Sequence, residues 1–224
     1  MKGVIKAVIF DVGGVLVIPK FPVSLIQNTH LSGIPAHCGH RNIGVHEYIA
    51  DKLKILLDQW FDAIDTSYAE SIEGKLTEKE VLAVISKNLG ISSQKIKKFV
   101  IKAYIENFIQ NKQLFKQAFK LKKQGYKIAV LSDQWPLSKK AIMPERIYKK
   151  FNKVVVSCDV GMRKPNLKIY KLLLKKLKLP ASKTVFIDNQ KWNITPAKKL
   201  GMKTILFESN EQCFEELKKL GVSK

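Results

Sequence analysis

Short apolar runs alternate with amphipathic stretches through most of this chain. Five runs rich in β-branched residues predict buried strands, at 4–10, 127–132, 153–158, 184–187 and 203–207. Helical periodicity fills the intervals, at 111–124, 138–150 with an interruption at Pro144, 166–178, 192–200 and 210–220. Alternating strands and helices predict an α/β fold, a three-layer Rossmann-like core in which helices cover both faces of a parallel sheet.

The segment between the first two strands has a different pattern. Three helical stretches follow one another there without a strand between them, at 46–66, 77–89 and 93–109. Thr77 and Glu80 have the spacing of a capping box at the start of the second helix. We therefore predict an all-helical cap domain at 18–109, inserted into a core domain formed by residues 1–17 and 110–224.

Positive charge is concentrated in the predicted core. The 224-residue chain has a formal net charge of +21, and residues 110–224 carry 27 Lys and Arg against 8 Asp and Glu. Residues 18–109 are nearly balanced, with 11 against 10. Such a core attracts small anionic substrates. Only Arg41, Arg146 and Arg163 are arginines, so bidentate contacts to phosphates and bases are scarce and we expect no specific nucleic-acid binding.

The compartment is suggested by what the chain lacks. Its three cysteines, Cys38, Cys158 and Cys213, are odd in number and widely spaced, which argues against a disulfide framework. No apolar run approaches the ~20 residues that cross a bilayer, and the first strand begins too early to leave room for a signal peptide. We expect a soluble cytoplasmic protein without membrane contacts, as a monomer or a homodimer.

The candidate chemistry begins where the first strand ends. Asp11 closes that apolar run and is followed closely by Gly13 and Gly14. In open α/β sheets the carboxyl ends of the strands form the ligand-binding edge. A carboxylate there acts as a nucleophile or holds a cation, and the glycines let the backbone turn sharply and approach a ligand.

Three later segments continue this pattern in a fixed order. Ser132 ends the second core strand, Lys164 precedes Pro165 and a helix, and Asp188 and Asn189 end a later strand. This order resembles the four motifs of the haloacid dehalogenase-like (HAD) hydrolase superfamily, and the helical insert after the first motif is similar to that of its subfamily IA-like branch. The resemblance covers nearly the whole chain and is weakest in the cap.

The resemblance implies a phosphatase that works through an aspartyl-phosphate on a small phosphorylated metabolite. Asp11 matches the nucleophile, Ser132 matches the hydroxyl that hydrogen-bonds the phosphoryl group, and Lys164 matches the lysine that neutralises both. Preorganised charge of this kind is what phosphoryl transfer requires. Three neighbouring positions are expected to contact the substrate: Gly14, Asp133 and Asn193.

The resemblance also implies a Mg²⁺ cofactor. The matching ligands are Asp11, the carbonyl of Gly13, Asp188 and Asn189. An acidic pair is usual in the fourth motif, and Asn189 is neutral. Because Mg²⁺ relies on carboxylate ligands, we expect weakened affinity for the metal, with Asp188 compensating directly or through water.

Two further positions depart from the family pattern. Gly13 stands where phosphatases of this type carry a second Asp, which protonates the leaving alkoxide and later activates water. Its loss removes general acid–base help of roughly 10²–10⁴ in rate, which predicts a preference for acyl and aryl phosphates. Asp133 stands where Asn is common. Its carboxylate either faces the phosphate or points away and caps the next helix.

Two alternatives remain open. The departures at Gly13, Asp133 and Asn189 are compatible with a degenerate relative that binds an anionic ligand or partner with little turnover. The spacing after Lys164 and Asn189 also resembles the metal-independent 2-haloacid dehalogenases, which need an arginine from the cap. Arg41 is the only arginine in the predicted insert and falls in a predicted loop.

The insert contains every histidine of the chain. The group comprises His30, His37, His40 and His46, with Cys38 among them. The spacing matches no zinc signature, so we predict a specificity loop over the site. Trp60 and Phe61 are predicted to belong to the core of the insert. Trp135 and Trp192 are predicted to pack against the core domain rather than to stack on substrate.

Overall fold

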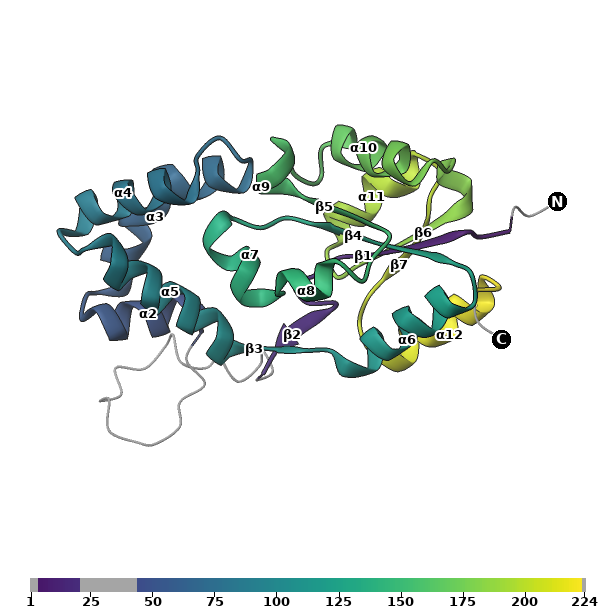
Figure 1. Ribbon diagram of the computed structural model, residues 1–224, viewed down its shortest axis with the longest axis horizontal. Coiled ribbons are helices and arrows are strands. Elements are labelled where there is room, and N and C mark those ends of the chain that lie inside the picture. The colour runs from purple at the N-terminus through teal and green to yellow at the C-terminus, as the bar shows by residue number, and fades with distance from the viewer. Residues whose placement is uncertain (1–3, 21–43, 223–224) are drawn as a thin grey trace.

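The structure, a computed structural model, describes residues 4–20 and 44–222 (Figure 1). Its main sheet has the parallel strand order β5-β4-β1-β6-β7. The strands are β1 (Ala7–Phe10), β4 (Lys127–Ser132), β5 (Lys153–Val156), β6 (Thr184–Asp188) and β7 (Lys203–Leu206). In the central strands nearly every residue is buried, as expected of a sheet covered on both faces. The predicted α/β fold is confirmed.

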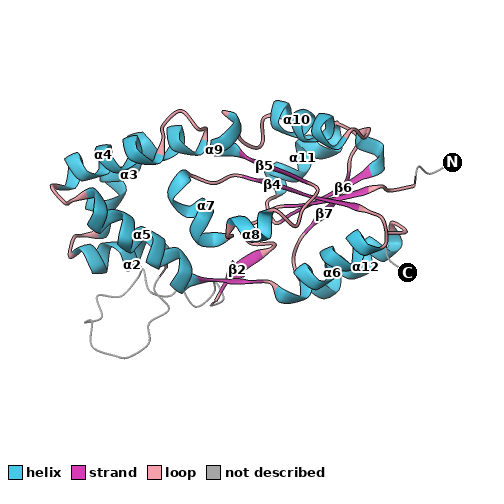
Figure 2. Ribbon diagram, viewed as in Figure 1, coloured by secondary structure: helices cyan, strands magenta, loops and turns pink. Residues whose placement is uncertain are grey.

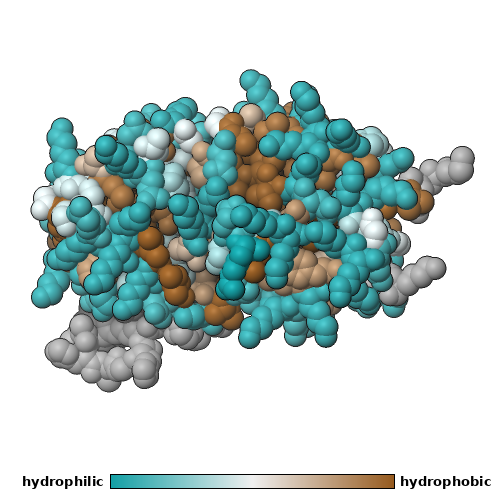
Figure 3. Space-filling model, viewed as in Figure 1, coloured by the Kyte–Doolittle hydropathy of each residue, from teal (hydrophilic) through white to brown (hydrophobic). Residues whose placement is uncertain are grey.

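Helices cover both faces of this sheet (Figure 2). The core segments are α6 (Lys112–Lys123), α7 (Pro136–Ile142), α8 (Glu145–Tyr148), α9 (Ser157–Val160), α10 (Leu167–Leu177), the short 3₁₀ helix η2 (Ala181–Lys183), α11 (Lys191–Lys199) and α12 (Asn210–Lys219). Leu114 of α6 and Leu217 of α12 pack in the cluster on one face, whereas Tyr170 of α10 and Ile194 of α11 pack on the other. Hydrophilic side chains cover much of the surface visible in Figure 3.

The segment between the first two core strands forms a separate group of helices. They are α2 (Val45–Leu53), α3 (Leu57–Ile72), α4 (Glu78–Leu89) and α5 (Ser93–Asn107). The predicted capping box is confirmed, since Thr77 N–H donates to Glu80 and Glu80 N–H donates to Thr77 Oγ1. The prediction of one helix over 46–66 is wrong. Lys54 adopts a left-handed φ of 60° that ends α2.

Two strands that the sequence did not predict join these helices to the core. Val17–Pro19 forms β2 and Phe108–Gln110 forms β3, and they pair antiparallel with Ile18 opposite Ile109. The predicted helix 93–109 therefore ends two residues early. Lys20 N–H donates to the carbonyl of Asn107, and Asn111 N–H donates to that of Leu16. The chain enters and leaves the helical insert side by side.

The insert packs against the core through aromatic side chains. The buried ring of Trp135, which follows β4, lies edge-to-face on Tyr68 of α3 at 5.1 Å between centroids. Its indole N–H donates to the hydroxyl of Tyr104 in α5 at 3.1 Å. Trp135 thus belongs to the same buried cluster as Trp60 of the insert. Among the described residues, no helix is long and apolar enough to cross a membrane.

Candidate active site

Three polar side chains meet at one edge of the sheet because adjacent parallel strands end there. Asp11 follows β1, Ser132 ends β4 and Asp188 ends β6, and β1 lies between the other two strands. The backbone N–H of Asp11 donates to the carbonyl of Ile187 at 2.9 Å. The sheet register therefore fixes where these side chains stand, as expected for the carboxyl ends of parallel strands.

Lys164 joins two of these carboxylates from the loop between α9 and α10. Its Nζ lies 3.0 Å from Asp11 Oδ1 and 2.7 Å from Asp188 Oδ2, and only 3% of the residue is exposed. Burial opposes the charge on the ammonium, but the carboxylates of Asp11 and Asp188 outweigh it and raise the pKa of Lys164. Lys164 is a permanent cation at this site.

Asp11 is held between opposing influences. Burial raises its pKa to about 6; Lys164 opposes that shift and Asp188 adds to it. Its Oδ1 lies 3.0 Å from Lys164 Nζ, which favours the ionised carboxylate. Asp11 is therefore mostly ionised at neutral pH and lies beside a fixed cation.

Asp188 differs from Asp11 because protein donors occupy both of its oxygens. Oδ1 accepts from the backbone N–H of Gln190 at 2.7 Å, Oδ2 accepts from Lys164, and Nδ2 of Asn193 lies within 3.2 Å of both. The carbonyl of Asn193 accepts in turn from the hydroxyl of Tyr170 at 2.9 Å. Asn193, which was predicted to contact substrate, supports the Asp188 carboxylate through its amide nitrogen.

The two glycines after Asp11 have different surroundings. A Cβ on Gly13 would meet nothing within 4 Å. Gly14 has a φ of +79°, and a Cβ there would lie 2.3 Å from Nδ2 of Asn189. The side chain of Asn189 therefore packs directly over Gly14. Only glycine fits at position 14, whereas position 13 is open.

The oxygens around Gly14 fit a small hard cation. Asn189 Oδ1 is buried and accepts no hydrogen bond from the described residues. The carbonyl of Gly13 likewise accepts none from the part of the chain that is described. With Asp11 these groups offer oxygen ligands of the kind Mg²⁺ takes. The described residues contain no group of three His, Cys, Asp or Glu side chains placed for a metal. Of the three oxygen ligands named above, only Asp11 supplies a carboxylate.

Ser132 and Asp133 are held by neighbours that the sequence did not reveal. Ser132 Oγ accepts from Nε2 of Gln134 at 3.3 Å, and Gln134 N–H donates to Ser157 Oγ at 3.0 Å. Asp133 Oδ1 accepts from the backbone N–H of Lys164 at 3.1 Å. It does not cap α7, whose N-cap is Trp135. Asp133 instead ties the β4 loop to the Lys164 loop, and burial raises its pKa.

Other predictions have mixed outcomes. His30, His37, Cys38, His40 and Arg41 lie outside the described residues. Trp60 and Trp135 are buried as predicted, but Phe61 is 43% exposed and Trp192 is 63% exposed. The predictions that Phe61 belongs to the core of the insert and that Trp192 packs against the core domain are therefore wrong.

The remaining histidine, His46, is half-buried in the insert. His46 accepts at Nδ1 from the indole N–H of Trp60 at 2.9 Å, and burial lowers its pKa.

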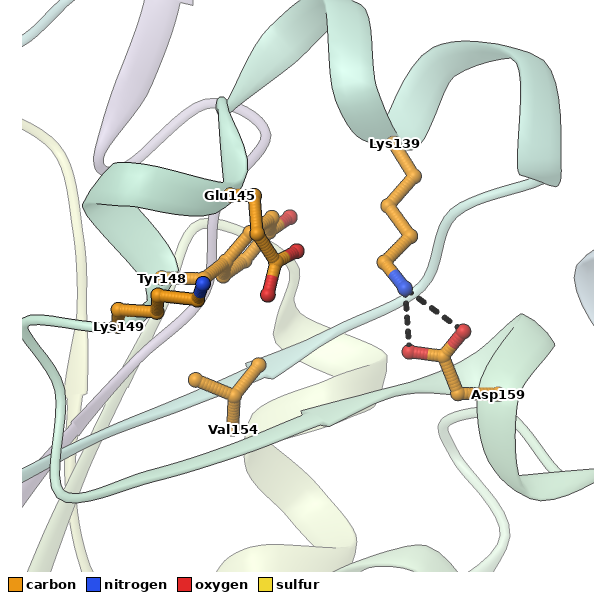
Figure 4. Close-up of a pocket in the computed structure, with 6 residues that line it drawn as sticks. All are labelled: Lys139, Glu145, Tyr148, Lys149, Val154 and Asp159. Atoms are coloured by element: carbon orange, nitrogen blue, oxygen red, sulfur yellow. Dashed lines mark hydrogen bonds and ion pairs between the residues drawn. The ribbon is translucent and has the colours of Figure 1, made fainter.

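A pocket beside the edge strand β5 contains none of the motif residues (Figure 4). Its volume is about 300 Å³, and it is lined by Lys139, Glu145, Tyr148, Lys149, Val154 and Asp159. Lys139 Nζ lies 2.7 and 2.6 Å from the two oxygens of Asp159. Because the two acidic and two basic residues balance, nothing in this pocket selects an anion.

Comparison with known proteins identifies a family and several relatives that are similar to this chain. The haloacid dehalogenase-like hydrolase family matches residues 5–201. The bifunctional epoxide hydrolase 2 of Mus musculus is 27% identical over 96% of this chain, which spans only 39% of that protein. The glyceraldehyde 3-phosphate phosphatase of Methanocaldococcus jannaschii is 34% identical over 40% of each chain.

Solved structures agree on the fold. An HAD family enzyme of Bacteroides thetaiotaomicron, in complex with magnesium and inorganic phosphate, matches with a TM-score of 0.66 and 19% identity, covering 92% of this chain and 96% of that one. The L-2-haloacid dehalogenase of Xanthobacter autotrophicus matches with a TM-score of 0.54 and 19% identity, covering 98% and 85%.

The sheet, the acidic strand ends and the buried lysine define an α/β hydrolytic enzyme with a helical insert. The chain belongs to the haloacid dehalogenase-like hydrolases.

Proposed function

We propose that this protein is a Mg²⁺-dependent phosphatase that hydrolyses a small phosphorylated metabolite through an aspartyl-phosphate. The observation that carries the proposal is the pair formed by Asp11 and Lys164. A carboxylate that is mostly ionised at neutral pH stands at a strand end, and a buried ammonium lies 3.0 Å away. A nucleophile and a fixed cation at this distance suit an incoming phosphoryl dianion.

The residues divide the reaction between them. Asp11 attacks phosphorus, a new P–O bond forms, and the bond to the leaving-group oxygen breaks. Lys164 neutralises charge on the nucleophile and on the phosphoryl oxygens, and the Ser132 hydroxyl donates to one of those oxygens. Water then hydrolyses the aspartyl-phosphate and regenerates the Asp11 carboxylate. With glycine at position 13, the leaving oxygen takes its proton from water, which favours acyl and aryl leaving groups.

The residues that would hold Mg²⁺ are Asp11, the carbonyl of Gly13 and Asn189. The metal would supply positive charge that offsets the repulsion between the carboxylate and the phosphate. Asp188 would act on it through water, because its own oxygens already accept from Lys164, Gln190 and Asn193. One carboxylate in direct contact implies weak affinity.

Hydrolysis of p-nitrophenyl phosphate and acetyl phosphate, with and without Mg²⁺, tests the proposal. Asp11→Asn removes the nucleophile and is expected to lower the rate by at least about 10⁴-fold. Asp159→Asn, outside the site, is the matched control and keeps the rate. Equal rates in wild type and Asp11→Asn would refute the aspartyl-phosphate.

A second candidate is metal-independent attack of Asp11 on carbon, as in a 2-haloacid dehalogenase. The observation that favours it is that Asp188 offers no free oxygen to a cation. Chloride release from 2-chloropropionate in the presence of EDTA, absent in Asp11→Asn, would establish this alternative. If no chloride is released while phosphate release depends on Mg²⁺, the result would support the phosphatase over the dehalogenase.

A further inference from the structure

A second pocket lies beside Lys164, where the insert meets the core. Its volume is about 210 Å³, and it is lined by Glu73, Gly161, Met162, Arg163, Lys164, Pro165 and Asn166. Glu73 follows α3 of the insert, whereas the other residues form the loop that carries Lys164 into the site. In Figure 1 the end of α3 approaches α9, from which this loop starts.

Close backbone contacts hold the two walls of this pocket together. A Cβ on Gly74, whose φ is +70°, would lie 2.5 Å from the carbonyl oxygen of Cys158. A Cβ on Gly161, which ends α9, would lie 3.9 Å from the carbonyl oxygen of Glu73. The end of α3 therefore packs closely against α9 and the start of the loop that carries Lys164.

Arg163 is the cation of this pocket without a local counter-ion. It is half-buried, and no carboxylate of the described residues lies within ion-pair distance of its guanidinium. The nearby acids are engaged elsewhere, since Glu73 pairs with Lys75 at 2.9 Å and Asp133 accepts from the backbone N–H of Lys164.

The charge of Arg163 nevertheless reaches across the pocket. It helps to lower the pKa of Glu73 and opposes the rise that burial causes in the pKa of Tyr68 and of Asp133. Glu73 and Tyr68 come from α3 and its end, and Asp133 comes from the loop after β4. Arg163 therefore acts electrostatically on both the insert and the core, and it lines the same pocket as Lys164.

We propose that Arg163 binds a carboxylate on the leaving group of the substrate, which makes the substrate class phosphate esters of hydroxy acids. The inference rests on the proposed function, because it places the phosphoryl group on Asp11 and Lys164 and the carboxylate in the adjoining pocket. A guanidinium presents parallel N–H donors that match the two oxygens of a carboxylate. Glu73 in the same pocket disfavours a second phosphate dianion, which one guanidinium would not neutralise.

Two aryl phosphates of similar shape test this assignment. 4-Carboxyphenyl phosphate carries the charge, and 4-carbamoylphenyl phosphate replaces it with a neutral amide. The ratio of their kcat/KM values is measured in wild type, Arg163→Met and Arg163→Lys. Arg163→Met is expected to lower this ratio roughly tenfold to a hundredfold, chiefly through KM, because hydrogen bonds to a charged group are lost. Arg163→Lys retains the charge without the fork and should fall between.

The controls separate a binding role from a structural one. Arg146→Met removes the same charge from an exposed position of the core and should leave the ratio as in wild type. Circular dichroism checks that each variant is folded. An unchanged ratio in folded Arg163→Met would overturn the assignment while leaving the phosphatase intact.

Binding of 4-carboxybenzylphosphonate and of its carbamoyl analogue, measured by calorimetry, covers the case in which the aryl phosphates are not hydrolysed. A carboxylate preference that Arg163→Met abolishes would uphold the pocket and reject the phosphatase. Equal binding of the two phosphonates by wild type would reject the assignment.

Discussion

The core and the helical insert differ in where they place their charged side chains. In the core, charged side chains are buried at strand ends and are paired, as in the contacts of Lys164 with Asp11 and Asp188. In the insert, the ion pairs lie at the surface, and the interior is built from apolar groups around Trp60. Among the described residues, none from the insert hydrogen-bonds Asp11 or Lys164.

This difference suggests a division of roles, in which the core carries out the reaction and the insert selects the substrate. The proposed chemistry depends on side chains whose positions the sheet register fixes, so we expect it to tolerate little change. Among the described residues, the insert approaches the site along its contact with the core, through Tyr68, Tyr104 and Glu73. Substitutions in the insert should therefore alter which substrate binds, and substitutions at the strand ends should alter whether it reacts.

The largest expected contrast is between a buried and an exposed ion pair. Lys164→Met leaves two buried carboxylates without their cation and should lower the free energy of unfolding by roughly 3–5 kcal/mol. Lys97→Met in the insert breaks a half-exposed ion pair with Glu78. It should change the free energy of unfolding by less than about 1 kcal/mol. Urea unfolding measures both, and comparable losses would remove the distinction between the two regions.

An acid introduced at position 13 tests whether the core alone sets the rate of the reaction. A Cβ on Gly13 meets nothing within 4 Å, so Gly13→Asp fits without displacing a neighbour. General acid help should raise kcat/KM for glycerol 3-phosphate roughly a hundredfold. Gly13→Asn matches the size without the acid and should show no such gain. Equal rates in the two variants would show that proton donation to the leaving group is not limiting.

The two regions should also respond to pH in opposite directions. Asp11 must be ionised to attack, so below its pKa of about 6 the value of kcat/KM should fall about tenfold per pH unit. Because that pKa is raised above 3.8, the folded state favours the protonated form, and Asp11 makes the protein less stable as pH rises from about 4 to 6.

The titration of His46 in the insert changes the stability of the protein in the opposite direction. The pKa of His46 is lowered from 6.5 by burial, so its contribution to stability is lost as pH falls below 6.5. Thermal unfolding of Asp11→Asn and His46→Gln across this range separates the two contributions. If each variant showed the same dependence of stability on pH as wild type, these two assignments of the pH dependence would be wrong.

The smallest effect is expected inside the insert. Trp60→Phe removes the hydrogen bond to His46 and should lower the free energy of unfolding by about 1–2 kcal/mol. The kcat for p-nitrophenyl phosphate should stay as in wild type. Phe61→Tyr, at a position 43% exposed, should alter stability by less than about 0.5 kcal/mol. A change of kcat in Trp60→Phe would show that the insert takes part in the chemistry.

The sequence predicted the core better than the insert for a physical reason. Strands that are buried on both faces appear as apolar runs, and the polar residue that ends each run marks the edge of the sheet. The break after Leu53 carries no glycine or proline, since Lys54 itself takes the left-handed conformation. The three-residue strands β2 and β3 are too short to show an alternating pattern.

Within the site, residue types were predictable and partners were not. Asp11 and Lys164 stand at motif positions, and the structure places them together. The support that Gln134 gives to Ser132, and the engagement of both Asp188 oxygens, arise from packing between distant segments. The open space at Gly13 beside the closed space at Gly14 depends on where Asn189 lies.

The antiparallel pairing of β2 with β3 makes the insert a replaceable module. Ile18 and Ile109 are register partners although 91 positions separate them, so a tight turn joining the two strands would close the core without moving its sheet. A different insert grafted between the same residues would leave Asp11, Ser132 and Asp188 at their strand ends, provided that it also covers Trp135. New specificity can therefore arise in this architecture by recombination at one hairpin, without rebuilding the catalytic edge.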